Sequence, residues 1–198
     1  MPLLGPSDPL PHPPRRVVVA GSSGAGKSTL ARGIAAALRL SYVEMDALYH
    51  GPQWTPRPEF AADVRKFVRG EAWATEYQYN HVRPLLLAAA DTLVWLDFPR
   101  HLVMRRLVVR TVRRRITRSH LWNGNYEPPL HTVFTDREHL WRWAWTSYGR
   151  TRHKMTTVLD GEHGARLAIV RLRGQKDVDR WRAGPLRHAA GLDEESLR

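Results

Sequence analysis

One short segment near the amino terminus, residues 17–30, restricts the possible folds of this chain more than any other feature. It reads VVVAGSSGAGKSTL and fits the pattern G-x-x-x-x-G-K-[ST], whose fixed positions are here Gly21, Gly26, Lys27 and Ser28. A β-branched run precedes the glycines and an alanine-rich stretch with helical periodicity follows them. The segment therefore predicts a buried strand, a glycine-rich turn and a helix, which together are typical of an α/β fold.

The residue types of this turn indicate a phosphate-binding loop. Glycines allow backbone N–H groups to converge on phosphate oxygens, and the positive end of the following helix points to the same anion. We expect Lys27 to reach the β- and γ-phosphates of ATP, and Ser28 to offer its hydroxyl to Mg²⁺ as a metal ligand. The predicted ATP-binding segment comprises Gly21, Ser22, Ser23, Gly24, Ala25, Gly26, Lys27, Ser28 and Thr29.

Strand and helix patterns alternate along the rest of the chain, which predicts a parallel sheet with right-handed crossovers. Expected strands cover residues 17–20, 41–45, 72–75, 92–96 and 167–172. Expected helices cover residues 27–38, 60–68, 82–90, 100–118, 135–148 and 177–182, and a loop covers residues 120–135. Thr135 and Glu138 match a capping box at the start of the fifth of these helices.

The length of 198 residues predicts one folded domain, which we place at residues 16–185. A proline-rich flexible leader at residues 1–15, without the pattern of a signal peptide, would precede it. The stretch of residues 100–152 is longer than one crossover needs, and this excess indicates a lid. The remaining expected parts are an acceptor-binding segment at about 46–70, a lid at about 105–150 and a polar tail at 186–198.

Composition limits the possible partners and surroundings of the protein. The net charge of +12 predicts an anionic partner, either nucleotide phosphates, nucleic acid or an anionic surface. No apolar run approaches the roughly 20 residues of a membrane helix. The absence of cysteine excludes disulfides and thiolate metal sites, and fits a cytoplasmic location. The ten histidines show no metal-binding spacing, and the sequence leaves the oligomeric state open.

Three acidic residues follow predicted strands, where ligands of open parallel sheets bind. Asp46 is a candidate for contact with the phosphoryl acceptor or for the general base, and a turn cap is its alternative. Glu76 is a candidate for binding the acceptor hydroxyl or the water shell of the metal, and a salt bridge to a lid arginine is its alternative. Asp97 precedes Phe98-Pro99, and we expect it to cap the next helix.

Basic and aromatic side chains supply further candidates. The expected helix from Arg100 has arginines and no acid, which favours phosphate contacts that stabilise the transition state of phosphoryl transfer. Its candidates are Arg106, Arg110, Arg113 and Arg114. Arg173 leaves the last strand and is a candidate border of the adenine ring. Trp54 and Tyr49 are candidates for stacking on the acceptor, whereas packing is the favoured role of Trp141, Trp145 and Tyr148.

Together with the phosphate-binding loop, the segments D-A-L-Y-H at 46–50, W-L-D-F-P-R at 95–100 and L-W-N-G-N at 121–125 carry a resemblance. The chain resembles the adenylate kinase-like P-loop proteins, and more narrowly the bacterial group of DNA topology modulation proteins. The resemblance implies a three-layer α/β/α fold with a five-stranded parallel sheet in the order 2-3-1-4-5. It also implies that Asp46 faces the acceptor and that arginines between residues 106 and 118 form lid contacts. The chain has Glu76-Tyr77 where many relatives have Asp-Gly, so we expect Tyr77 to narrow the acceptor site.

The function that these observations favour is transfer of the γ-phosphoryl group from ATP·Mg to a small acceptor. The acceptor would be a nucleoside monophosphate or a hydroxylated small molecule. The candidate catalytic residues are Lys27, Asp46, Glu76, Arg110 and Arg114, and Arg106 and Arg173 are further candidates for nucleotide binding. Two alternatives remain open: a nucleotide-dependent regulator that binds nucleic acid, and an ATP-binding protein without transfer activity.

Overall fold

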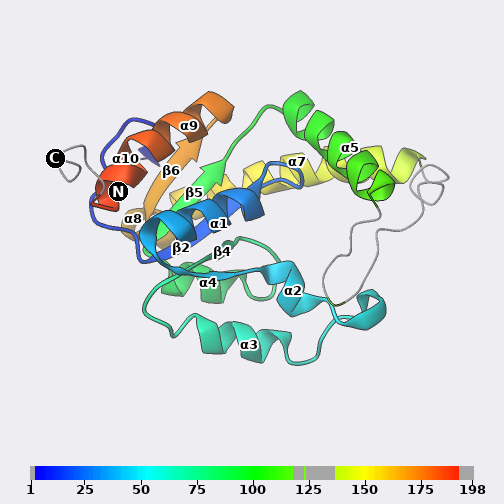
Figure 1. The fold of residues 1–198 in the computed structure, drawn as a ribbon, viewed down its shortest axis with the longest axis horizontal. Coiled ribbons are helices and arrows are strands. Elements are labelled where there is room, and N and C mark those ends of the chain that lie inside the picture. The colour runs from blue at the N-terminus through cyan, green and yellow to red at the C-terminus, as the bar shows by residue number, and fades with distance from the viewer. Residues whose placement is uncertain (1–2, 118–122, 124–136, 192–198) are drawn as a thin grey trace.

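The computed structural model describes residues 3–117, 123 and 137–191, apart from the side chains of residues 114, 115 and 137–147. A parallel sheet lies between two layers of helices (Figure 1). Its strands are β1 (Leu3–Leu4), β2 (Arg16–Gly21), β3 (Ser41–Val43), β4 (Trp73–Glu76), β5 (Thr92–Leu96) and β6 (Ala168–Leu172), in the spatial order β1-β6-β5-β2-β4-β3. The predicted α/β/α architecture is confirmed.

The prediction of a five-stranded sheet is wrong, because the described residues form a sheet of six strands. The additional strand, β1, pairs with β6 at the edge of the sheet, with Leu3 opposite Ile169 and Leu4 opposite Val170. The five predicted strands keep their predicted order relative to one another, β3-β4-β2-β5-β6, and β1 beyond β6 makes the order of the whole sheet different from the five-stranded one. Leu4 and Leu10 pack against the hydrophobic core, so this part of the expected flexible leader is folded onto the domain. Apolar burial and the unpaired edge of β6 both favour this pairing.

The central position of β2 follows from its sequence. The strand pairs with β4 on one side and β5 on the other, with Val18 opposite Thr75 and Leu93. Residues 17–20 are fully buried, as a strand covered on both faces requires. Consequently the loop that follows β2 emerges in the middle of the carboxyl edge of the sheet, where the neighbouring strands also end.

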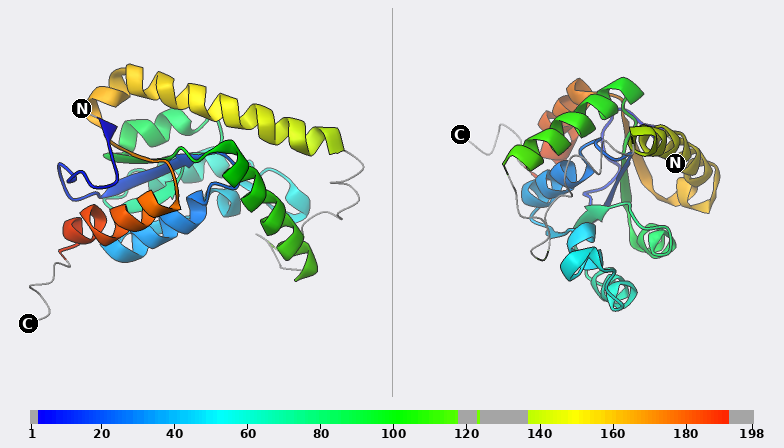
Figure 2. Two further views of the ribbon diagram at one scale, coloured as in Figure 1. Left: turned by 90° about the horizontal axis from the view of Figure 1, so that it is seen from above. Right: turned by 90° about the vertical axis from the view of Figure 1, so that its right-hand side faces the viewer.

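The helices cover both faces of the sheet (Figure 2). The described helices are α1 (Lys27–Leu38), α2 (Met45–Tyr49), α3 (Phe60–Phe67), α4 (Arg83–Ala89), α5 (Arg100–Ile116), α7 (Arg137–Asp160), α8 (Glu162–Arg166), α9 (Gln175–Ala183) and α10 (Pro185–Ala189), with a 3₁₀ turn at Pro52–Trp54. Side chains of β2 alternate between two core clusters, one with α1 and α9 and the other with α3, α4 and α7.

Several boundaries differ from the sequence-based expectations. β3 ends at Val43 rather than at residue 45, and Asp46 lies within α2, which was not predicted. Helix α7 continues to Asp160, well beyond the expected end at residue 148. Leu186 of α10 is buried in the core, so the beginning of the expected tail is also folded. The expected loop of residues 120–135, apart from Asn123, lies outside the described residues, as does the capping residue Thr135.

Candidate functional site

The loop between β2 and α1 has the geometry of a phosphate-binding loop. Gly24 and Gly26 have φ angles of +86° and +97°, in the left-handed region that favours glycine. A Cβ atom on Gly24 would lie 2.9 Å from the carbonyl oxygen of Val103, so the close packing of α5 on the loop requires a glycine there. Gly26 caps α1, and the free N–H groups of the first helical turn therefore face the cavity beside the loop.

Lys27 is the first residue of α1 and its ammonium folds back over the loop. Its Nζ donates a hydrogen bond to the carbonyl oxygen of Ser22, with the two atoms 3.3 Å apart. The pKa of Lys27 is lowered to about 8, mainly by burial; the negative charges of Asp46 and Glu76 oppose this shift, and the positive charges of Arg110 and Arg83 add to it. A triphosphate bound at the loop would supply the counter-charge that this buried ammonium requires.

A cavity of about 800 Å³ opens beside the loop. Predicted site residues from three separate segments line it, namely Ser23, Gly24, Gly26, Lys27, Ser28 and Thr29 from the loop and α1, Asp46 from α2, and Arg106 and Arg110 from α5. The cavity also has lining residues that sequence reasoning missed as site residues, among them Arg32, Gln78 and Arg182. The loop hydroxyls, the lysine, a carboxylate and two arginines of α5 therefore share one cavity.

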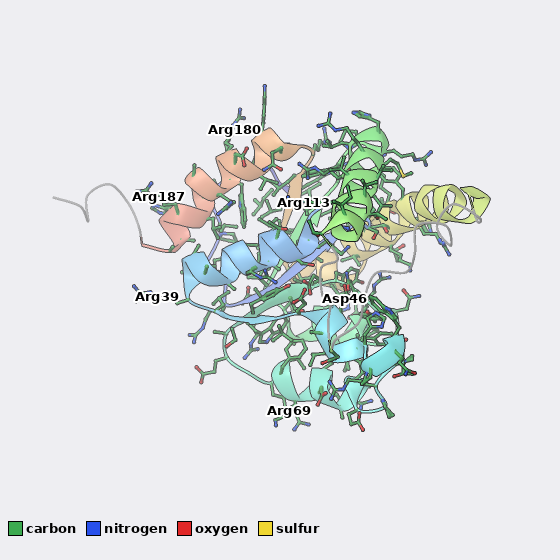
Figure 3. The ribbon with its side chains drawn as sticks, turned by 45° about the vertical axis from the view of Figure 1, so that its right-hand side comes forward. Arg39, Asp46, Arg69, Arg113, Arg180 and Arg187 are labelled. Carbon is green, nitrogen blue, oxygen red and sulfur yellow. The ribbon has the colours of Figure 1, made fainter. Side chains whose placement is uncertain are left out.

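Asp46 is held at this cavity by its neighbours. Its Oδ1 accepts a hydrogen bond from the hydroxyl of Tyr79 at 2.7 Å, and the same hydroxyl lies 3.3 Å from Nε2 of His50. Burial and the bond to Asp46 raise the pKa of Tyr79, so the tyrosine remains a donor. Tyr49 stacks on Tyr79 with ring centroids 4.1 Å apart, and this stacking fixes the tyrosine. Figure 3 shows Asp46 on α2 near the centre of the molecule.

Glu76 ends β4 and is almost completely buried, with 1% of its surface exposed. Its carboxylate accepts hydrogen bonds from the hydroxyl of Tyr42 at 2.6 Å and from the backbone N–H of Met45 at 3.1 Å. Within the described part of the chain these partners take the place of an arginine, so the alternative of a salt bridge to a lid arginine is not seen there. Glu76 lies behind the cavity lining, but its charge acts on Lys27.

Asp97 does not play the predicted role of a helix cap. Its carboxylate, which is 4% exposed, accepts from Nε of Arg171 at 2.9 Å and from Nε of Arg152 at 3.1 Å. Arg171 comes from the neighbouring strand β6 and Arg152 from α7, so Asp97 joins the sheet to that helix. Two arginines are stronger partners for a buried carboxylate than backbone N–H groups alone. The first turn of the next helix instead uses Pro99, whose carbonyl oxygen accepts from the N–H of Leu102.

The predicted arginines occupy different positions. Arg106 crosses the phosphate-binding loop, where its guanidinium donates to the carbonyl oxygen of Ala25 at 3.4 Å and to Oε1 of Gln175 at 2.7 Å. Arg110 lines the main cavity. Arg113 lies on another side of α5 beside an exposed apolar patch, and the side chain of Arg114 lies outside the described residues.

A second cavity of about 320 Å³ adjoins the loop on the side of α9. Its lining includes Ala25, Arg106, Phe98 and Gln175, and the guanidinium of Arg106 lies 4.9 Å from the ring centroid of Phe98. The predicted border residue Arg173 lines neither of the two cavities, and its N–H instead donates to Asp177 at the start of α9. The ring of Phe98 and the guanidinium of Arg106 in this second cavity are a flat apolar group and a cationic group, and such groups suit a nucleobase.

Some of the aromatic candidates line the main cavity, whereas others are buried away from it. Trp54 lines the main cavity and packs edge-on against His50, with ring centroids 5.1 Å apart. Tyr77 is buried in the core under Arg83 and lines no part of that cavity, so the predicted narrowing of the site by this ring is not seen. Tyr148 donates to the carbonyl oxygen of Phe98, which is a packing role. The side chains of Trp141 and Trp145 lie outside the described residues.

Comparisons with known proteins support the kinase-like fold. A gluconokinase from Sinorhizobium meliloti has a TM-score of 0.51 and 17% identity, and the match covers 94% of this chain and 97% of that one. A shikimate kinase from Nitrobacter winogradskyi is 29% identical over 143 residues, which is 66% of each chain. A bifunctional pantoate ligase/cytidylate kinase from Synechococcus sp. is 47% identical over 51 residues, 25% of this chain and 9% of that protein. No protein-family model matches.

The fold and the loop geometry together define this chain as an α/β protein with a P-loop kinase-like fold. The chain spans less than two thirds of the length of the two curated relatives, so their activities are not transferred by likeness alone. The narrower resemblance to DNA topology modulation proteins stays a prediction. In the described part of the chain, no helix combines the length and apolarity that crossing a membrane would require.

Proposed function

We propose that this protein is an ATP-dependent kinase that transfers the γ-phosphoryl group to a hydroxyl of a small molecule. One observation carries the proposal: a single cavity is lined by the P-loop with Lys27, by Asp46 from the segment after β3, and by Arg106 and Arg110 from α5. Phosphoryl transfer needs donor phosphates, an oriented acceptor and cations over the transferring group, and these are the groups that meet here.

In this proposal the loop N–H groups and Lys27 would hold the donor phosphates, and the hydroxyl of Ser28 would serve as a ligand of Mg²⁺. Bound Mg²⁺ would neutralise charge on the β- and γ-phosphates. The residues present fit such a ligand, because the start of α1, the Lys27 side chain and Ser28 all line one cavity beside the loop. Arg106 and Arg110 would close over the transferring group and exclude water, as part of a lid at about 105–150.

The acceptor would bind on the side of α2 and Gln78, in the segment at about 46–70 and the loop after β4. Asp46 is the better situated candidate to orient the acceptor hydroxyl and accept its proton, because it lines the cavity whereas Glu76 lies behind it. Hydroxylated acceptors are also what the names of the gluconokinase and the shikimate kinase indicate for those proteins. ATP and an acceptor of this kind are available in the cytoplasm, where we place the protein.

The test is a coupled assay of ADP formation with ATP, MgCl₂ and a panel of sugars, sugar acids, hydroxylated ring acids and nucleoside monophosphates. We expect at least one acceptor to raise the rate well above slow ATP hydrolysis, and Asp46→Asn to remove that increase. Tyr79→Phe is the matched control, since it keeps the carboxylate but removes its hydrogen-bond donor. If no acceptor raises the rate, the kinase proposal fails.

The same experiments separate the two alternatives. A protein that binds ATP without transfer would show calorimetric ATP binding that Lys27→Met weakens, and no acceptor-dependent rate. A nucleic-acid-binding regulator would bind DNA with an affinity that falls steeply with salt concentration. Arginines such as Arg39, Arg69, Arg180 and Arg187 point outward from separate regions of the molecule rather than forming one face (Figure 3). This dispersal favours the kinase over the regulator.

A further inference from the structure

A cluster of basic side chains lies where the loop between β4 and α4 meets the first residue of α4 and helix α7. The side-chain oxygen of Asn80 accepts hydrogen bonds from Arg83 at 2.6 Å and from Nζ of Lys154 at 2.9 Å. One neutral oxygen thus holds two cations from helices far apart in the sequence. Figure 2 shows α4 and α7 running on the same side of the sheet.

Arg83 is oriented in this cluster and incompletely satisfied. Its guanidinium lies over the ring of Tyr77, 4.8 Å from the centroid, and the bond to Asn80 fixes a second point. Its Nε is buried and has no hydrogen-bond partner among the residues that the structure describes. A buried N–H of a charged group costs free energy unless an acceptor meets it. The described residues therefore leave one donor of this charged group unmatched.

The charges around the cluster have one sign. Burial lowers the pKa of Lys154, and the positive charges of Arg83 and Arg150 lower it further, while no described carboxylate opposes them. Burial is also the main cause of the lowered pKa of Arg83, which only Tyr77 counteracts. An anion between these side chains would relieve both the repulsion and the burial of unpaired cations.

The cluster is connected to the site of phosphoryl transfer. The loop that carries it begins at Glu76, passes Gln78 in the cavity lining and Tyr79 on Asp46, and reaches Asn80 in the next position. The charge of Arg83 acts on Lys27, which sets the guanidinium within electrostatic range of the lysine. An acceptor whose hydroxyl lies at Asp46 would extend along this loop toward the cluster.

We propose that Arg83 and Lys154 bind an anionic group of the phosphoryl acceptor, so that the enzyme acts on acids in preference to the corresponding neutral hydroxyl compounds. The group is a carboxylate or a phosphate, since both accept from guanidinium and ammonium donors. This inference rests on the proposed kinase function and names the class of its acceptor.

The experiment compares matched pairs: sugar acids against the parent sugars, hydroxy acids against their amides, and nucleoside monophosphates against nucleosides. Turnover is measured at saturating ATP·Mg, and binding of the same compounds is measured by calorimetry with a non-hydrolysable ATP analogue. We expect the acid of the active pair to be preferred by about 10- to 100-fold in kcat/KM, the range of a charge-assisted contact. The carboxylate and phosphate pairs show which anion is bound.

The variants Arg83→Gln and Lys154→Gln are expected to raise the KM of the anionic acceptor about 10-fold or more and to leave the KM of ATP within about 2-fold. The neutral member of the pair should lose little, and Arg83→Lys should restore part of the preference. Lys176→Gln, on the exposed surface of α9, is the control. If Arg83 and Lys154 had a purely structural role, the variants would instead have a lower unfolding midpoint and would lose activity with all substrates alike.

Failure of this inference differs from failure of the kinase function. Equal turnover of acids and neutral compounds, unchanged by both variants, would overturn the anion site while the kinase stands. If no compound is turned over, calorimetry tests the anion site separately. The anion site is then overturned if the acids bind to the wild type no more tightly than their neutral partners. Salt-sensitive binding of oligonucleotides that both variants remove would also overturn it, in favour of a nucleic-acid surface.

Discussion

Replacing Lys27 by methionine should stabilise the nucleotide-free protein while weakening ATP binding. Methionine keeps most of the length of the side chain and removes its charge. In the folded protein burial lowers the pKa of Lys27 from the ordinary value of 10.5 to about 8, so the folded state disfavours the ammonium form. Under the proposed function, this cost is retained because the ammonium binds the donor phosphates.

The size of the effect follows from the pKa difference. One pKa unit corresponds to ~1.4 kcal/mol, so the shift from 10.5 to about 8 means that the charged lysine costs at most roughly 3.5 kcal/mol of folding free energy at pH 7. The side chain retains some exposure, and the substitution also removes the hydrogen bond from Nζ to Ser22. After these are subtracted, we expect Lys27→Met to raise the free energy of unfolding by about 1–2 kcal/mol at pH 7.

The pH dependence gives the sharper result. Between about 8 and 10.5 the unfolded chain binds a proton at Lys27 that the folded chain has lost. The stability of the wild type therefore rises with pH across this window relative to the variant, because the unfolded state binds more protons. The advantage of Lys27→Met should be complete below about pH 8 and should disappear as the pH approaches 10.5.

Urea unfolding of both proteins at pH 7, 8.5 and 10, without nucleotide, measures this difference. Calorimetry at pH 7 with ATP and MgCl₂ should show the opposite ranking for ligand binding, with the affinity of the variant lower by about 10-fold or more. A variant that is less stable at pH 7, or a stability difference that does not change with pH, would refute the reasoning that the ammonium is buried without a full counter-charge.

Three further substitutions test separate parts of the site. Gly24→Ala should destabilise the protein by about 1–3 kcal/mol and weaken ATP binding, because the new Cβ would lie 2.9 Å from the carbonyl oxygen of Val103 at a positive φ; urea unfolding and calorimetry measure both. Asp97→Ala should cost about 2–3 kcal/mol in urea unfolding by leaving Arg171 without its carboxylate, and a change below about 0.5 kcal/mol would contradict the ion-pair assignment. Asp46→Asn should lower kcat at saturating ATP by about 10²- to 10⁴-fold in the coupled assay, whereas wild-type turnover would exclude Asp46 as the base.

The core of the fold could be predicted from the sequence because its signals are local. A β-branched run entering a glycine-rich turn predicts β2, the phosphate-binding loop and α1 within a few residues of one another. The first strand could not be predicted in this way. Leu3 and Leu4 form too short a segment to show periodicity, and they are a strand only because the edge of β6 is available to pair with them.

Site residues that directly follow a strand could be predicted from the sequence. Residues whose position depends on contacts between distant segments could not. Asp46 follows β3 closely in the sequence, so topology brings it to the cavity. Arg106 and Arg110 reach the site from the predicted arginine-rich helix, but only the orientation of that helix separates them from Arg113. Asp97 was expected to be a cap because the local pattern fits one, and its partner Arg171 is 74 residues away.

The electrostatic character of the cavity connects the basic composition to the proposed reaction. Cationic side chains exceed carboxylates in the lining, where Lys27, Arg32, Arg106, Arg110 and Arg182 face Glu44 and Asp46. A site with this excess attracts a nucleotide triphosphate and remains attractive to a second anion once Mg²⁺ has neutralised part of the first. Part of the net charge of +12 is therefore explained within the site itself, and under the proposed function we expect kcat/KM for ATP and for the acceptor to be higher at low salt.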